Sequence, residues 1–178
     1  SPSDVARTFY NETTNPTGVK NIDLSIKQIL THGSTSNSAA DYIDALNARL
    51  NEIGCGKLAT VMGRFYGMDR DNRWERVGKA YAALVYGEGI QTDDAAEAVR
   101  KSYTVKDEEG KFITDEFVLP TVVKGTERIN DGESVIFFNF RPDRAREITR
   151  TFVDDDFSGF ERKGGRKKVF YVCMTQYD

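Results

Sequence analysis

The sequence predicts an α/β fold: a three-layer sandwich in which helices flank a mostly parallel sheet, with a small β excursion near residues 112–134. Two observations predict this class. Short apolar runs of strand length alternate along the chain with segments whose apolar residues recur every three to four positions, which is the period of an α-helix. Strands that alternate with helices favour a parallel sheet covered on both faces, and 178 residues are enough for one such domain.

The first elements follow a polar, turn-rich beginning. Apolar and polar residues alternate over residues 22–26, which predicts one strand. Residues 38–53 carry apolar side chains at helical spacing and Gly54 follows them, so a helix that ends at this glycine is expected. The apolar run 58–63 then predicts a short buried strand.

The middle of the chain continues the alternation. Residues 74–85 have the apolar pattern of an amphipathic helix, which Gly87 closes, and a weaker helix is expected around residues 93–103. Residues 117–123 are apolar and predict a strand. Because Pro120 in this run has no backbone N–H to donate, the strand is expected at an edge or a bulge of the sheet.

The last part of the chain is expected to add two strands around one helix. The run 135–140 is continuously apolar and of strand length, and Pro142 follows it at a helix start, with the helix reaching about residue 152. Residues 169–174 close the chain as another apolar run. Both runs are expected to be buried strands, because apolar residues fill both of their faces.

Composition excludes several classes of protein. Lys and Arg number 25 against 28 Asp and Glu, which leaves no uniformly basic face for nucleic acid or an anionic membrane. No apolar run approaches the length of a membrane span, and the start of the chain lacks the pattern of a signal peptide. Cys55 and Cys173 are far apart in sequence and form no C-x-x-C pair, so a reduced cytoplasmic protein is expected.

Four arginines stand where strands are expected to lead into helices. Arg64 and Arg70 lie in the loop after the strand at 58–63, and Arg141 and Arg144 follow the strand at 135–140. Open α/β sheets bind ligands at such junctions, where helix N-termini and guanidinium groups can bind one anion together. The sequence therefore predicts a site for a small polyanion, provided that the two junctions are adjacent in space.

Purely structural interpretations of these and other residues stay open. The arginines could be surface residues paired with neighbouring aspartates, of which Asp143 is one. The lone histidine, His32, lies in a Ser/Thr-rich loop and is more simply a solvated side chain than a base. The run Asp154–Asp156 cannot direct three consecutive carboxylates to one ion, so no metal site is predicted, and no catalytic residue is assigned.

Three long motifs resemble the cofactor-independent phosphoglycerate mutases, in the family's order along the chain. They are residues 56–77 (GKLATVMGRFYGMDRDNRWERV), residues 115–120 (DEFVLP) and residues 137–145 (FFNFRPDRA). The resemblance extends over residues 38–178 and identifies this part as the family's phosphotransferase domain. In that family the domain is inserted into a second domain of alkaline-phosphatase type, which holds two manganese ions and a serine that accepts the phosphoryl group.

The resemblance implies a function for the arginines. In the family, the residues that match Arg64, Arg70, Arg141 and Arg144 bind 2- or 3-phosphoglycerate during the isomerisation of 3- to 2-phosphoglycerate, a step of glycolysis. Residues 1–37 depart from the family: its Asp-Gly-Arg-Asp loop and its catalytic histidine are not matched, and His32 is no counterpart of that histidine. This segment is therefore expected to be a replacement strand or derived from the way the chain was made.

The resemblance thus indicates a truncated or engineered domain that clamps phosphoglycerate, has no cofactor of its own and is inactive without the metal-binding domain of the parent enzyme as a partner. Two alternatives stay open. One is a complete small phosphoryl-transfer catalyst with His32 as base or nucleophile. The other is a noncatalytic scaffold or interaction module derived from the domain.

Overall fold

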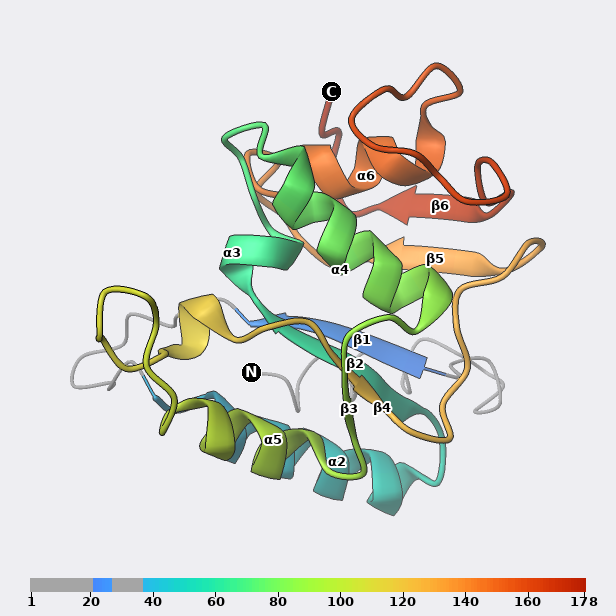
Figure 1. Cartoon of the computed structure of the whole chain (residues 1–178). Coiled ribbons are helices and arrows are strands. Elements are labelled where there is room, and N and C mark those ends of the chain that lie inside the picture. Colours follow the sequence, from blue (N-terminus) through green and yellow to red (C-terminus); the bar gives the residue numbers. More distant parts are fainter. Residues whose placement is uncertain (1–20, 27–36) are drawn as a thin grey trace.

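A computed structural model describes residues 37–178 and the backbone of residues 21–26 (Figure 1). The predicted α/β class is confirmed. Helices α2 (Ala39–Ile53) and α5 (Ala95–Ser102) lie on one side of the strands, and α4 (Trp74–Tyr86) and α6 (Arg146–Val153) lie on the other (Figure 1). His32 and most of the segment 1–37 lie outside the described residues.

The described strands form two small sheets. The larger has the order β1-β2-β4-β3, with β1 at Asn21–Ile26, β2 at Lys57–Gly63, β4 at Thr121–Val123 and β3 at Ile90–Thr92. The smaller consists of β5 (Ser134–Phe137) and β6 (Phe170–Cys173). The pairs β1/β2, β3/β4 and β5/β6 are parallel and only β2/β4 is antiparallel, so the described sheets are mostly parallel.

Helix ends follow the sequence signals closely. Gly54 and Gly87 end α2 and α4 in the left-handed conformation, at φ 70° and 69°, which glycine adopts without a steric cost. Asp94 caps α5 by accepting a hydrogen bond from the backbone N–H of Glu97 at 3.0 Å. The two helix pairs pack on opposite sides of β2, so that Val61 contributes to one apolar cluster and Met62 to the other.

The strand expected at residues 117–123 is shorter and placed differently. Asp115–Phe117 form the single 3-10 turn η1, the strand β4 begins only at Thr121, and β4 lies inside the sheet between β2 and β3. The prediction of an edge strand was therefore wrong. Pro120 stands just before the ladder, where its missing N–H costs nothing, and its carbonyl oxygen accepts the N–H of Ile90 at 3.0 Å.

The C-terminal elements are also shorter than expected. Residues 142–145 form a turn closed by the N–H of Ala145 on the Pro142 oxygen at 2.9 Å, so α6 begins four residues after the proline. The strands β5 and β6 are only half-buried, with Ile136 47% and Phe170 72% exposed. The expectation of two fully buried strands was wrong, because only one face of this pair packs on the apolar cluster of α4 and α6.

Asp115 ties η1 to the start of α2. The residue is 3% exposed, and its carboxylate accepts hydrogen bonds from the backbone N–H groups of Ser38 at 3.1 Å and Ala39 at 3.4 Å and from the hydroxyl of Tyr103. These N–H groups belong to a helix N-terminus and have no partner within the helix. Asp115 therefore acts as a helix cap supplied from a distant part of the chain.

We expect Asp115→Ala to lower the free energy of unfolding by about 2 kcal/mol, because two backbone donors and one hydroxyl lose a buried acceptor. Urea denaturation measures the loss. Asp44→Ala is the control, since Asp44 lies half-exposed on α2 and its ion pair with Arg100 lies at the surface. Equal stabilities of the two variants would contradict the capping role.

Candidate functional site

The first strand-to-helix junction is built around Arg64. β2 ends at Gly63, and Arg64 is the first residue of the short helix α3 (Arg64–Gly67). Its guanidinium Nη2 lies 2.8 Å from Oε2 of Glu116, which η1 supplies. Nε of Arg64 is buried and has no hydrogen-bond partner among the described residues. The carboxylate of Glu116 therefore holds one end of the Arg64 guanidinium group.

Arg70 lies in the loop between α3 and α4 and reaches the second junction. Its Nη1 lies 3.2 Å from Oδ2 of Asp143, and the same oxygen lies 3.3 Å from Nη2 of Arg141. Burial alone would raise the pKa of Asp143, but the charges of Arg141 and Arg70 outweigh that effect and lower it. One ionised carboxylate thus joins two arginines that are far apart in sequence.

Arg144 lies in the turn before α6 and completes the cluster. Its Nη1 donates a hydrogen bond of 3.0 Å to the carbonyl oxygen of Met68, in the loop that also carries Arg70. Burial lowers the pKa of Arg144, and the positive charges of Arg64 and Arg70 lower it further, against the opposing charges of Glu116 and Asp143. Arg144 is therefore in electrostatic reach of arginines from the first junction.

The two junctions are adjacent in the structure, as the sequence interpretation requires. If the arginines were only surface residues, they would pair with neighbouring aspartates, and such a pairing is found for Asp143. Asp69 pairs instead with Arg76 of α4, at 3.2 Å. The role of the four arginines in binding stays a prediction.

Two acidic residues of this region were missed by sequence reasoning. Glu116 orients Arg64, and Glu147 of α6 accepts the backbone N–H of Asn72 at 2.9 Å. Both contacts join segments more than 50 positions apart, so no local pattern reveals them. Glu116 does lie inside the motif DEFVLP, which was the one available signal.

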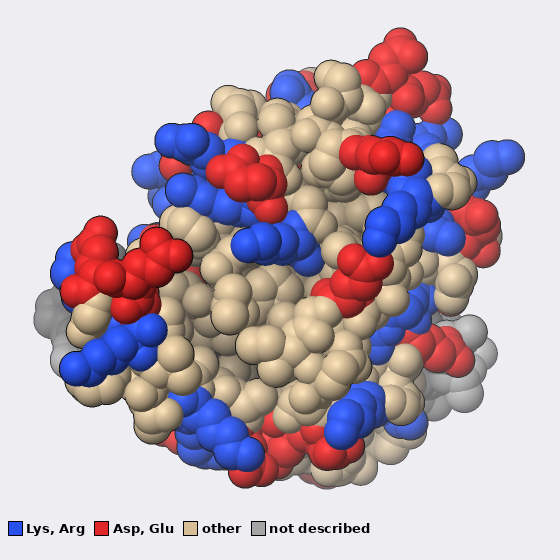
Figure 2. Space-filling model, viewed as in Figure 1, with Lys and Arg blue, Asp and Glu red and all other residues tan. Residues whose placement is uncertain are grey.

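The face of the molecule that Figure 2 shows has charges of both signs, as the composition predicts, with Lys and Arg interspersed among Asp and Glu. Within residues 37–178 no three His, Cys, Asp or Glu side chains group so that they could hold a metal ion. Among the helices of the described part of the chain, none is long and apolar enough to cross a membrane.

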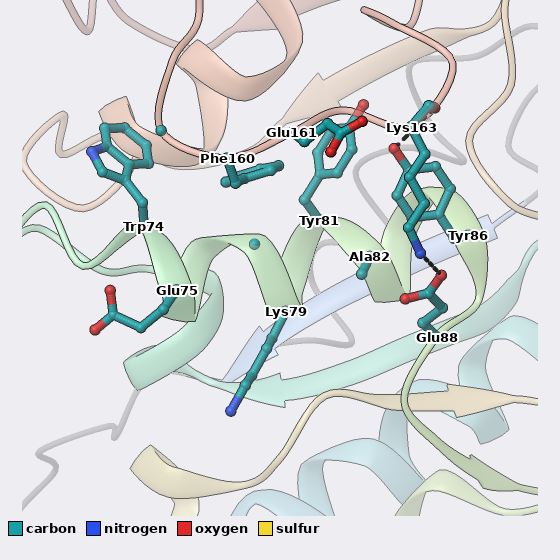
Figure 3. A pocket seen from close by; sticks show the side chains of 12 residues that line it. Trp74, Glu75, Lys79, Tyr81, Ala82, Tyr86, Glu88, Phe160, Glu161 and Lys163 are labelled. Atoms are coloured by element: carbon teal, nitrogen blue, oxygen red, sulfur yellow. Dashed lines mark hydrogen bonds and ion pairs between the residues drawn. The ribbon is translucent and has the colours of Figure 1, made fainter.

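A hollow of about 620 Å³ lies elsewhere, on the outer side of α4 (Figure 3). Trp74, Tyr81 and Tyr86 of this helix line it, together with Phe160 and Lys163 from the loop that follows α6. An ion pair of 2.7 Å between Lys163 and Glu88 closes one end. None of the four arginines lines this hollow, so it is distinct from the arginine cluster.

Comparisons with known proteins agree with one another. The sequence matches the family model iPGM_N, described as "BPG-independent PGAM N-terminus", over residues 28–178. The 2,3-bisphosphoglycerate-independent phosphoglycerate mutase of Lachnoclostridium phytofermentans is 56% identical over 145 residues, which cover 79% of this chain and 27% of the relative. The mutase of the same description from Acetivibrio thermocellus is 55% identical over 146 residues, with 80% and 27% covered.

A solved structure is similar as well. The crystal structure of Leishmania mexicana phosphoglycerate mutase at low cobalt concentration gives a TM-score of 0.69 at 33% identity, and the match covers 79% of this chain and 27% of that one. The chain therefore spans about a quarter of the length of the relatives it matches.

Proposed function

Because this chain belongs to the family of 2,3-bisphosphoglycerate-independent phosphoglycerate mutases, we propose that it is the substrate-clamping part of such an enzyme. In this proposal it binds 2- or 3-phosphoglycerate for the isomerisation of 3- to 2-phosphoglycerate in glycolysis, in the cytoplasm. The binding groups are the four guanidinium groups of the cluster: Arg64, Arg70, Arg141 and Arg144.

The observation that carries the proposal is the excess positive charge of the cluster. Among the described residues, the four guanidinium groups share two bonded carboxylates, those of Glu116 and Asp143, which leaves an excess of two positive charges in this set. Positive charges that are held close together raise the free energy of the folded protein, and an anion bound among them lowers it again. Phosphoglycerate carries a phosphate and a carboxylate, and guanidinium groups bind both in bidentate geometry.

The same charges suit the chemistry of the family. A phosphoryl group in transfer spreads negative charge over its oxygens, and fixed cations stabilise that charge without reorganising. In this chain the cluster can bind and orient the substrate. The resemblance assigns the family's two manganese ions and its phosphoryl-accepting serine to the second domain, and we therefore propose that this chain alone does not interconvert the two phosphoglycerates.

Arg141 offers a sharp test, because its side chain is 73% exposed and contributes little to stability. We expect 3-phosphoglycerate at about 100 times its dissociation constant to stabilise the wild-type chain by about 2.7 kcal/mol, and Arg141→Ala to remove most of this gain while its unliganded melting temperature stays unchanged. Thermal melts at low salt, with and without ligand, measure both quantities. Arg144→Ala should also lose the gain but melt earlier, because its bond to Met68 is lost.

Arg100→Ala is the matched control for this experiment. Arg100 is about as exposed as Arg70 and pairs with Asp41 and Asp44 on the opposite helix layer, so the ligand-induced shift should persist in this variant. Absence of any shift in the wild-type chain at millimolar ligand would count against the clamp and favour a noncatalytic module.

A further inference from the structure

A buried pair of acidic residues lies next to two arginines of the cluster. Asp69 comes from the loop of residues 68–73, which also carries Arg70, and Glu147 comes from the first turn of α6, just after Arg144. The two residues are 4% and 5% exposed, and their carboxyl groups are close enough to interact electrostatically. Buried carboxylates are costly, so their place here calls for a specific role.

Asp69 organises the loop locally. Its Oδ2 accepts the backbone N–H groups of Asp71 and Arg73, each at 3.0 Å, while its Oδ1 accepts from Nη1 of Arg76 at 3.2 Å. These bonds fold residues 69–73 around one carboxylate. Arg70 lies inside the folded segment, so its Cα position depends on this carboxylate.

Glu147 joins the folded loop to α6. Its Oε1 accepts the backbone N–H of Asn72 at 2.9 Å, and Asn72 has the left-handed φ of 56° that non-glycine residues seldom adopt. Its Oε2 is buried and receives no hydrogen bond from any donor of the described residues. A proton on this oxygen would supply the bond to Asp69, and the raised pKa of Glu147, due first to burial and then to the neighbouring charge of Asp69, supports that state.

We propose that Asp69 and Glu147 are positioning residues of the arginine cluster: they fix the loop of residues 68–73 against α6 and so set the spacing between Arg70 and Arg144. Arg144 adds a third tie through Met68, so the loop is held to the second junction on both sides of Arg70. The consequence for ligand binding rests on the proposed function, since it presupposes that the cluster binds phosphoglycerate.

Two variants of Glu147 separate positioning from mere structural support. Glu147→Gln keeps an oxygen for Asn72 and offers an amide N–H to Asp69, so it should bind 3-phosphoglycerate within about two-fold of the wild-type affinity. Glu147→Ala loses both contacts and should bind 3-phosphoglycerate about ten-fold more weakly. A loss of about ten-fold is what one missing hydrogen bond to an acidic group would cause if its whole free energy were withdrawn from binding. Isothermal titration calorimetry of the whole chain at low salt measures the dissociation constants.

A matched control and a ligand-free measurement complete the test. Ile148→Val removes one methyl group from the next residue of α6, which faces the apolar cluster, and should leave the affinity unchanged although it lowers stability. Hydrogen exchange of the Asn72 amide should be about ten-fold faster in Glu147→Ala than in the wild type, because its acceptor is gone. If Glu147→Ala does not fold, Asp69→Asn takes its place in both measurements with the same expected direction.

The outcomes distinguish the inference from the proposed function. If no variant and not even the wild type binds 3-phosphoglycerate, the proposed function is wrong, and the exchange of the Asn72 amide alone then decides whether the pair holds the loop. If the wild type binds and Glu147→Ala binds equally well, the positioning role is overturned. A weaker affinity in Ile148→Val of the same size as in Glu147→Ala would also overturn it, because general destabilisation would then explain both.

Discussion

Replacing Gly63 with alanine is expected to lower the free energy of unfolding by at least about 3 kcal/mol, since it forces backbone segments apart. A Cβ at this position would lie 2.1 Å from the carbonyl oxygen of Glu116 and 2.8 Å from that of Asp115. Its φ of −69° and ψ of 156° are open to any residue, so the need for glycine comes from space alone. The N–H of Gly63 also donates to the Val118 oxygen at 2.8 Å, which holds the two segments together.

Gly78→Ala is the matched control. Gly78 lies within α4, and the atoms nearest to a Cβ there would be side-chain atoms of Phe160, the first at 3.4 Å. Because alanine favours the helix over glycine by about 1 kcal/mol, this variant should be as stable as the wild type or slightly more stable. Urea denaturation compares the two, and a Gly63→Ala variant within 1 kcal/mol of Gly78→Ala would show that η1 can move away from β2 at little cost.

Local signals in the sequence were enough to predict the two longest helices, α2 and α4. The positions of α2 and α4 follow from apolar spacing and from Gly54 and Gly87, because a C-terminal glycine ends a helix through its own backbone conformation. The pair of arginine junctions was predicted for a related reason. Each junction is a strand followed by a helix start, which is visible within a dozen residues.

Contacts between distant segments could not be predicted in the same way. The capping of α2 by Asp115 and the pairing of Arg64 with Glu116 depend on where η1 packs, and the place of β4 inside the sheet depends on its pairing with β2 and β3. Pro120 was a misleading signal because it lies one residue outside the ladder. The half-exposed strands β5 and β6 show the same limit, since apolar composition does not tell how many faces of a strand are covered.

Glu147 should make the stability of the protein depend on pH near neutrality. Burial first, and then the charges of Asp69 and Asp71, raise the pKa of Glu147 from 4.5 to about 7, against the opposing hydrogen bond from the Asn72 N–H. The folded protein therefore binds this proton more tightly than the unfolded chain does. The stabilisation that this proton gives is fully present below the unfolded pKa, falls as pH rises, and is lost above about 7.

Between pH 5 and pH 8 the free energy of unfolding should fall by on the order of 3 kcal/mol, because each unit of difference between the folded and unfolded pKa corresponds to about 1.4 kcal/mol. The pKa of Asp69 is lowered, because its hydrogen bonds to the Arg73 and Asp71 N–H groups, to Glu147 and to Arg76 together outweigh the effect of burial. Its contribution therefore changes only in more acidic solution, outside this interval. Within the buried pair, it is therefore Glu147 that makes the free energy of unfolding depend on pH near neutrality.

Glu147→Gln isolates this slope, because the amide keeps the shape and both hydrogen bonds but cannot titrate. Urea denaturation at a series of pH values gives the free energy of unfolding of both proteins. From pH 5 to pH 8 the wild type should lose about 3 kcal/mol of this free energy relative to the variant. The subtraction removes the titration of His32, which both proteins share. A difference that stays constant over this interval would mean that Glu147 is ionised throughout, and the buried pair would then be held by Arg76 and the backbone N–H groups rather than by a shared proton.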